Sequence, residues 1–405
     1  MKMWAELFKL KKMKRFFTTL SVLLLVGTAM AQLNGDGYYR VKNAVTERYI
    51  RIVDNSVPNV DITTTDIDLT SLESLKPFSK VISDPSTIIY IQFAQERTKW
   101  EKQYILRGQG SDTYQLTGYY LSIAESAATP GAYYAFGTAS GVTKYLNDER
   151  GDYSEGFLGT NDRTTRDWYV IPVTDADDQC FALTPEFSIG DDYYLSFYAS
   201  FPILLADDMT AYIVKQYKQG GAADGAELVA LTSKSVPSET PVIIKVASND
   251  PLKNKVTILN AEPAAVTTAN LLRGQYFSPS QTNHQGQQRY NTATMRVLGK
   301  TADGKLGLVT ADNKYLVKGA WEDDNYYLPS NKAYVVVAST SNSEAALLSG
   351  TEYSDFVTEV TGIHSANNAP NQQPATYTLQ GVRLADGQPL APGVYIVNGK
   401  KVVVK

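Results

Sequence analysis

Short strand-forming runs recur along this chain, and residues typical of turns separate them. The chain contains 27 Tyr, and aromatic and β-branched residues fit the half-buried surface of a pleated strand. In residues 37–43 the apolar side chains of Tyr39 and Val41 alternate with polar ones, and Tyr49 and Ile52 continue the pattern in a second predicted strand. The sequence therefore predicts an all-β protein.

The last residues, 376–405, predict a small antiparallel unit of three strands. The runs YTLQGVRL and GVYIVNG and the end of the chain, KVVVK, are rich in strand-forming residues. The steps Asp386-Gly387 and Asn398-Gly399 between them are hairpin signals, because Gly adopts a positive φ without a steric clash. Residues 351–375 contain a segment rich in Asn, Gln and Pro and are predicted to be a linker to this unit.

The same C-terminal unit contains a recognisable set of short motifs. These are Leu379, Gln380 and Gly381, the turn with Pro392, Gly393 and Tyr395, and the basic residues Lys400, Lys401 and Lys405. In these residues the unit resembles the sorting domain of cargo proteins of the type IX (Por) secretion system of Bacteroidota. The resemblance implies an exported protein, secreted or held at the outer cell surface, with the secretion machinery as a partner.

The N-terminal residues, 1–31, have the pattern of a signal peptide. A basic segment precedes a mostly apolar run of roughly a dozen residues, fewer than the roughly twenty that span a bilayer. Ala29-Met30-Ala31 then predicts cleavage between Ala31 and Gln32. The natural start is either Met1 or Met13. The mature chain is expected to have no transmembrane span, because no later run of apolar residues is long enough.

The charge balance argues against a nucleic-acid partner. Residues 1–31 hold six Lys or Arg and one acidic side chain, so the 38 basic and 42 acidic side chains of the whole chain become 32 and 41, a formal charge of −9. Binding to a phosphate backbone depends on clustered Lys and Arg, and no such cluster follows Arg15.

Few residues suit the common catalytic or metal centres. Cys180 is the single cysteine, and its apolar neighbours place it in a core. His284 and His364, in a polar loop and in the linker, leave little from which to build a Ser-His-Asp triad or a zinc site. The acidic pairs at 177–178, 191–192 and 207–208 could bind calcium, but they lack EF-hand spacing, and solvated turns are the favoured interpretation. We expect no metal, no cofactor and no catalysis.

Residues 32–172 are predicted to form a β-trefoil-like unit. GYYRVKN at residues 37–43 and RYI at 48–50 resemble the opening strand pair of ricin-type β-trefoil modules, although the Gln-x-Trp signature of their sugar-binding repeats is missing. Residues 66–83, with Leu69, Leu72 and Leu75 at a spacing of three, predict one helical insertion. Packing against the β unit is the favoured interpretation of this helix, and binding of a partner is the alternative.

Residues 173–350 are predicted to form a β-sandwich-like region. The segment 191–202 is its central strand, with 210–215 as the expected partner strand, and 301–305 and 310–314 are expected hairpin turns. An internal echo links VPSETPVII at 236–244 with LPSNKAYVV at 328–336, 92 positions later. In each copy a Pro-Ser step leads into an apolar strand.

Candidate ligand-binding residues are those suited to a sugar, which aromatic faces hold by stacking and planar polar groups hold by hydrogen bonds. The alternative for this set is a solvated turn, and the alternative for Trp168 is a place in the core. The candidates are Trp321, Glu322, Asp323, Asp324, Tyr326 and Trp168.

Three functions remain open from the sequence. The first is a non-catalytic surface or secreted adhesin that binds a glycan or a host protein through the first β unit. The second is a structural or assembly spacer. The third is a glycoside hydrolase that uses two carboxylates, with Glu322 as one of them.

Overall fold

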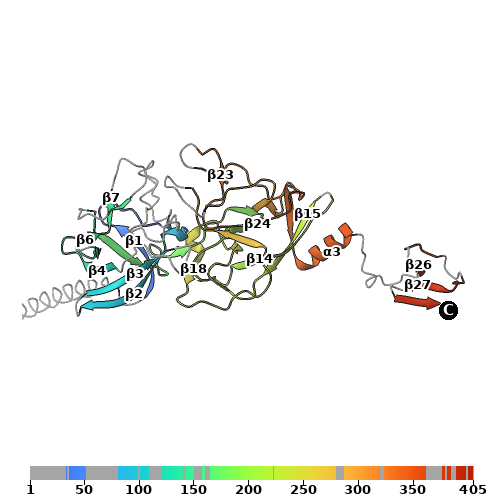
Figure 1. The fold of residues 1–405 in the computed structure, drawn as a ribbon, viewed down its shortest axis with the longest axis horizontal. Helices are drawn as coiled ribbons and strands as arrows, with labels where there is room; N and C mark the ends of the chain where they lie inside the picture. The colour runs from blue at the N-terminus through green and yellow to red at the C-terminus, as the bar shows by residue number, and fades with distance from the viewer. Residues whose placement is uncertain are drawn as a thin grey trace, which may run out of the picture.

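The computed structural model confirms the all-β class, with strands dominating and the helix α3 (Gly350–Thr361) packed near one end (Figure 1). No helix among the described residues is long and apolar enough to cross a membrane. The predicted leader and its cleavage point lie outside these residues. The structure describes residues 33, 36–51, 81–98, 101–108, 121–139, 142–149, 157–159, 165–221, 223–279, 287–319, 323–361, 376–378, 381–384, 389–397 and 400–404.

The N-terminal unit, coloured blue to green in Figure 1, is an antiparallel barrel. Its strand order is β1-β2-β3-β4-β5-β9, and it is closed because β9 pairs back onto β1. It is compatible with the predicted trefoil-like unit, and the helical insertion predicted at 66–83 lies outside the described residues apart from 81–83. The bounds are β1 Gly37–Asn43, β2 Ile89–Thr98, β3 Glu101–Arg107, β4 Leu121–Glu125, β5 Tyr133–Ala139, β6 Val142–Tyr145, β7 Asn147–Glu149, β8 Phe157–Gly159 and β9 Trp168–Pro172.

The alternation predicted for β1 is confirmed. Val41 is buried in the barrel core and Tyr39 packs against it. In the segment that follows, Ile50 is fully buried while Tyr49 is only half-buried, so Ile50 takes the inward position that was predicted for Tyr49. The other predicted position, Ile52, lies outside the described residues. Because successive side chains of a strand point to opposite faces, Tyr38 and Arg40 point out of the barrel.

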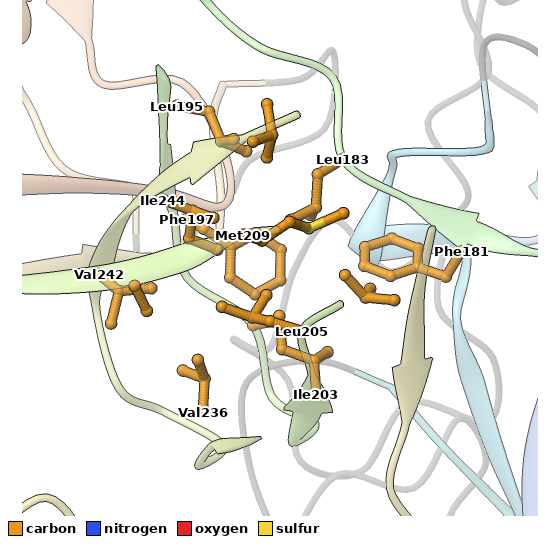
Figure 2. Packing of buried hydrophobic residues seen from close by; sticks show 14 of the residues in the cluster. Phe181, Leu183, Leu195, Phe197, Ile203, Leu205, Met209, Val236, Val242 and Ile244 are labelled. Atoms are coloured by element: carbon orange, nitrogen blue, oxygen red, sulfur yellow. The ribbon is translucent and has the colours of Figure 1, made fainter. Parts of the chain in front are cut away.

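The central region packs two sheets face to face, as a sandwich-like region does. The larger sheet has the order β11-β12-β17-β14-β15-β25-β21-β20-β24-β19, and the smaller has the order β10-β18-β13-β16. Phe181 and Ile203 of the smaller sheet meet Phe197 and Ile244 of the larger one in a shared core (Figure 2). The bounds are β10 Phe181–Ala182, β11 Phe187–Ile189, β12 Asp192–Phe197, β13 Ile203–Leu204, β14 Thr210–Lys218, β15 Asp224–Ala230, β16 Ser235–Val236, β17 Val242–Val246, β18 Lys255–Ile258, β19 Leu272–Gln275, β20 Met295–Lys300, β21 Leu306–Val309, β24 Lys332–Val336 and β25 Glu344–Leu348.

The larger sheet is buried on both faces. Ile244 faces the core shared with the smaller sheet, whereas its neighbour Ile243 joins Leu298 and Leu308 in a second core on the opposite face. The sheet curls around this second core into a half-barrel.

Two local predictions in this region need correction. The strand at residues 210–215 exists as β14, but β17 lies between it and β12, so it is not the direct partner of β12. The predicted turn at 301–305 does join β20 to β21. The predicted turn at 310–314 joins no hairpin, because the chain leaves β21 there for β22 (Val317–Lys318), which pairs with β23 (Tyr326–Tyr327) instead.

The internal echo has a structural counterpart. Glu239 and Asn331 occupy equivalent positions of the two Pro-Ser turns, and both adopt left-handed backbone conformations, with φ of 55° and 58°. Both turns also bond to the same segment, since the Glu239 amide donates to the Ala199 carbonyl and the Tyr198 amide donates to the Asn331 carbonyl. The two turns therefore flank the end of β12.

The predicted linker, 351–375, begins with a helix. Residues 350–361 form α3, and Tyr353 is buried beneath it. The ring of Phe356 lies against Gly225 of β15, so the helix belongs to the central region. Only the later part of the predicted linker, residues 362–375, lies outside the described residues.

Gly225→Ala is expected to destabilise the docked helix. A Cβ at this position would lie 2.6 Å from Cε1 of Phe356, so the ring must move. We expect a loss of about 1–3 kcal/mol and faster hydrogen exchange across residues 350–361. Gly221→Ala is the matched control, because its Cβ would meet nothing within 4 Å. Unchanged exchange in Gly225→Ala would contradict this packing.

The C-terminal unit contains three antiparallel strands, as predicted: β26 (Thr376–Thr378), β27 (Gly393–Val397) and β28 (Lys400–Val404). Val397 pairs with Lys400, and the turn predicted at Asn398-Gly399 lies outside the described residues. The run YTLQGVRL is not one continuous strand, because Tyr377 bridges to Arg383 around Gly381, whose φ is 80°.

Candidate functional site

A cleft of ≈ 270 Å³ lies where the barrel meets the central region, and we call it the junction cleft. At this junction the Val173 amide donates to the Tyr38 carbonyl, and Ile88 from the barrel side enters the core of the central region. The residues used below are Tyr38, Tyr90 and Arg107 on the barrel wall, and Phe201, Ser238, Glu239 and Glu262 on the opposite wall.

The barrel wall is a row of side chains from three neighbouring strands. In the strand register Tyr38 of β1 lies opposite Tyr90 of β2, and Tyr90 lies opposite Arg107 of β3. Directly paired residues of antiparallel strands share a face of the sheet and lie close together. The two tyrosine rings are in contact, with centroids 4.9 Å apart and planes inclined by 54°. The sheet register itself therefore builds two aromatic rings and a guanidinium group into one surface.

The opposite wall supplies acceptors that its own turns hold in place. Ser238 donates from its amide to Oε1 of Glu262, at 2.8 Å, and from its hydroxyl to Oε2, at 2.9 Å. The Tyr276 hydroxyl donates to Oε1 of Glu239 at 3.3 Å. Behind them Phe201 is buried and supports Tyr38, with ring centroids 5.8 Å apart.

Burial sets the protonation of the phenols around the cleft. It raises the pKa of Tyr38 to about 12, and the nearby Tyr90 and Glu262 add to this effect. Burial also raises the pKa of Tyr276, with Tyr198 and then Glu239 contributing. Both hydroxyls therefore remain protonated and can donate hydrogen bonds at neutral pH. Aromatic faces beside a few fixed polar groups are typical of small-molecule sites.

A second cleft of ≈ 470 Å³ lies at the same junction, but its charged groups already pair with one another. Arg51 contacts Asp84, with Nε to Oδ2 at 3.0 Å. Lys332 and the Ser196 amide both donate to Oε1 of Glu186, at 2.9 Å each. These pairs engage the cationic groups of the second cleft, although Oε2 of Glu186 is buried without a hydrogen bond. The described residues that line it include no Tyr or Trp, so the junction cleft, with its two tyrosine rings, is the better candidate.

The candidates predicted from the sequence do not gather at the junction cleft. Trp168 is 3% exposed and donates its indole N–H to the Leu146 carbonyl at 2.8 Å, so it is a core residue and offers no binding face. Asp323 accepts from the Tyr327 hydroxyl at 2.6 Å, and this bond contributes most to lowering its pKa. Asp324 pairs with Lys318 at 3.0 Å. Tyr326 is half-buried in β23, and Trp321 and Glu322 lie outside the described residues.

Sequence reasoning missed the junction residues. The outward position of Tyr38 was contained in the alternation of β1, and the echo at 236–244 marked the turn that carries Glu239. Neither signal says that the two face one another, because 201 residues separate them along the chain.

Two of the acidic pairs contribute one residue each to an ion pair, and the cysteine is buried. Among the described residues no group of three or more His, Cys, Asp or Glu side chains is placed to hold a metal ion. Asp177 pairs with Lys255, and Asp192 pairs with Lys245 at 2.7 Å. Cys180 is buried beside Ile82 and Ala182, and burial raises the pKa of its thiol. It packs as a small apolar residue, as predicted.

Comparison with known proteins adds no assignment: the chain matches no protein family model, no curated protein and no solved structure.

Proposed function

We propose that this chain is an exported, non-catalytic protein of the cell surface or the surrounding medium that binds a glycan in its junction cleft. The leader pattern of residues 1–31 and the resemblance of the C-terminal unit to a type IX sorting domain support export. The observation that carries the binding proposal is the row Tyr38, Tyr90 and Arg107 facing the acceptors Glu239 and Glu262.

This arrangement suits a sugar for a physical reason. A pyranose presents a patch of C–H groups that stacks on an aromatic face, and a rim of hydroxyls that bond to planar polar groups. Tyr38 and Tyr90 are half-buried, so the protein fixes their rings before a ligand arrives. Arg107 can donate to ring and hydroxyl oxygens, while Glu239 can accept from hydroxyls.

Tyr90→Ala is expected to weaken glycan binding by about tenfold or more, which corresponds to ~1.4 kcal/mol, because it removes one of the two stacking faces. The measurement is a glycan array with residues 32–405, followed by titration calorimetry with the best-bound oligosaccharide. Tyr377→Ala, in the C-terminal unit, is the matched control and should bind like the unaltered protein.

The array and a parallel hydrolysis assay also distinguish glycan binding from the two alternative functions, a spacer and a glycoside hydrolase. A spacer protein would leave every printed glycan unbound, and that result would contradict the proposal. A hydrolase would release reducing ends from polysaccharides in a parallel assay with the same preparation.

A further inference from the structure

The turn that carries Glu239 is strained in a way that its duplicate is not. Left-handed φ values are uncommon for residues other than Gly, and Asn tolerates them better than most residues do. Asn331 occupies the equivalent position in the second Pro-Ser turn with nearly the same φ, 58° against 55° for Glu239. An asparagine would therefore suit the backbone at position 239 better than the glutamate that is present. Strain kept at a cleft points to a role for the side chain.

The side chain of Glu239 is exposed and lines the junction cleft. The hydrogen bond from Tyr276 engages its Oε1 and fixes the direction of the carboxylate. Tyr276 is in turn packed against Tyr198, with ring centroids 4.3 Å apart. Tyr198 bonds to the duplicate turn through the Asn331 carbonyl. Both Pro-Ser turns and two tyrosine rings in contact thus position a single acceptor.

The charges lining the cleft favour one class of ligand. Arg107 supplies one positive charge, while Glu239 and Glu262 supply two negative charges. Glu262 is held by two hydrogen bonds from Ser238, so Glu239 is the carboxylate better placed to accept from a ligand. A carboxylate in a partly enclosed site attracts hydroxyl and ammonium donors and repels acidic groups.

We infer that Glu239 determines the specificity of the junction cleft, which selects neutral or amino-bearing sugars and rejects acidic ones. The inference rests on the proposed glycan-binding function. Glu239 acts by direct contact with the sugar, and Tyr276 is a positioning residue that acts through Glu239.

The test uses residues 32–405 and an array that prints neutral, amino-bearing, uronic and sialylated glycans. We expect the unaltered protein to bind neutral or amino-bearing glycans at least tenfold more strongly than their acidic counterparts. In Glu239→Asn we expect binding to these glycans to fall at least tenfold, while the thermal midpoint stays equal or rises. Loss of binding with gain of stability is a combination that a merely structural residue would not give.

Two further variants sharpen the result. Glu47→Asn is the matched control, because Glu47 also has a left-handed φ, 61°, and does not line the cleft. It should leave binding unchanged. Glu239→Gln keeps the size of the side chain and removes its charge, so it should narrow the discrimination against acidic glycans.

The outcomes distinguish the specificity role of Glu239 from the glycan-binding function. Preference of the unaltered protein for acidic glycans, or binding by Glu239→Asn within twofold of the unaltered protein, overturns the specificity role and leaves the binding function standing. An array on which the unaltered protein binds nothing overturns both.

Discussion

Arg40→Met is expected to destabilise the protein by on the order of 4 kcal/mol, because it removes the buried hydrogen bonds that the charged guanidinium donates to the carbonyls of Ile82 and Cys180, each contributing about 1.5–3 kcal/mol. Arg40 is 1% exposed, although it points out of the barrel. Burial lowers its pKa to about 10, so the guanidinium remains charged at neutral pH. It donates to the carbonyls of Val81, Ile82, Gln179 and Cys180 at 2.9–3.2 Å and to the hydroxyl of Thr87 at 3.3 Å.

These bonds cross the junction, since Arg40 belongs to β1 and Cys180 immediately precedes β10 of the central region. Arg40→Met should therefore lower the thermal midpoint by roughly 10 °C and make the barrel unfold before the central region, which differential scanning calorimetry would show as two transitions. Lys42→Met is the matched control on the same strand and outward face, and it should cost under about 1 kcal/mol. An Arg40→Met midpoint within a few degrees of the unaltered one would refute the role assigned to these bonds.

Asp148→Asn is expected to cost about 3–5 kcal/mol, because it leaves the buried charge of Arg48 without a countercharge. The Arg48 side chain is fully buried, and its Nε lies 2.6 Å from Oδ2 of Asp148. A second contact joins Nη2 of Arg48 to Oδ1 of Asp148, and the Thr46 hydroxyl also donates to the carboxylate. The pair ties the turn after β1 to β7.

Urea unfolding of single and double variants measures this coupling. The double variant Arg48→Met with Asp148→Leu removes both charges and should be more stable than Asp148→Asn alone. Asp192→Asn is the control, because its pair with Lys245 is exposed to solvent and should contribute under about 1 kcal/mol. If Asp192→Asn and Asp148→Asn lowered the free energy of unfolding equally, the prediction for the buried pair would be wrong.

Local signals in the sequence predicted the parts of the fold that depend on neighbouring residues. The alternation at Tyr39 and Val41 gave the core face of β1, and the strand-forming runs near the end of the chain gave the antiparallel pair of β27 and β28. The predicted linker failed at α3 because the helix is held by its contact with Gly225. Phe356, whose ring packs on Gly225, lies 131 residues further along the chain, so the local sequence around either residue does not predict this contact.

The candidate site depended on contacts between residues far apart in the sequence, which local patterns do not show. A tryptophan in an alternating strand fits either a core or a binding platform, and the indole hydrogen bond of Trp168 to Leu146 places it in the core. The junction cleft arises from the register of three strands and from the docking of a separate sheet. Periodicity could show that Tyr38 points outward, but it could not show what covers it.

The bonds of Arg40 also bear on how a ligand would enter. The two walls of the junction cleft come from units that buried hydrogen bonds hold together, so we expect the walls to move little relative to one another. A sugar would meet a slot of fixed width, and little ordering of the protein would oppose its capture. A receptor of the proposed kind would distinguish ligands by how well they fit, and its association rate should depend little on solvent viscosity beyond the effect of diffusion.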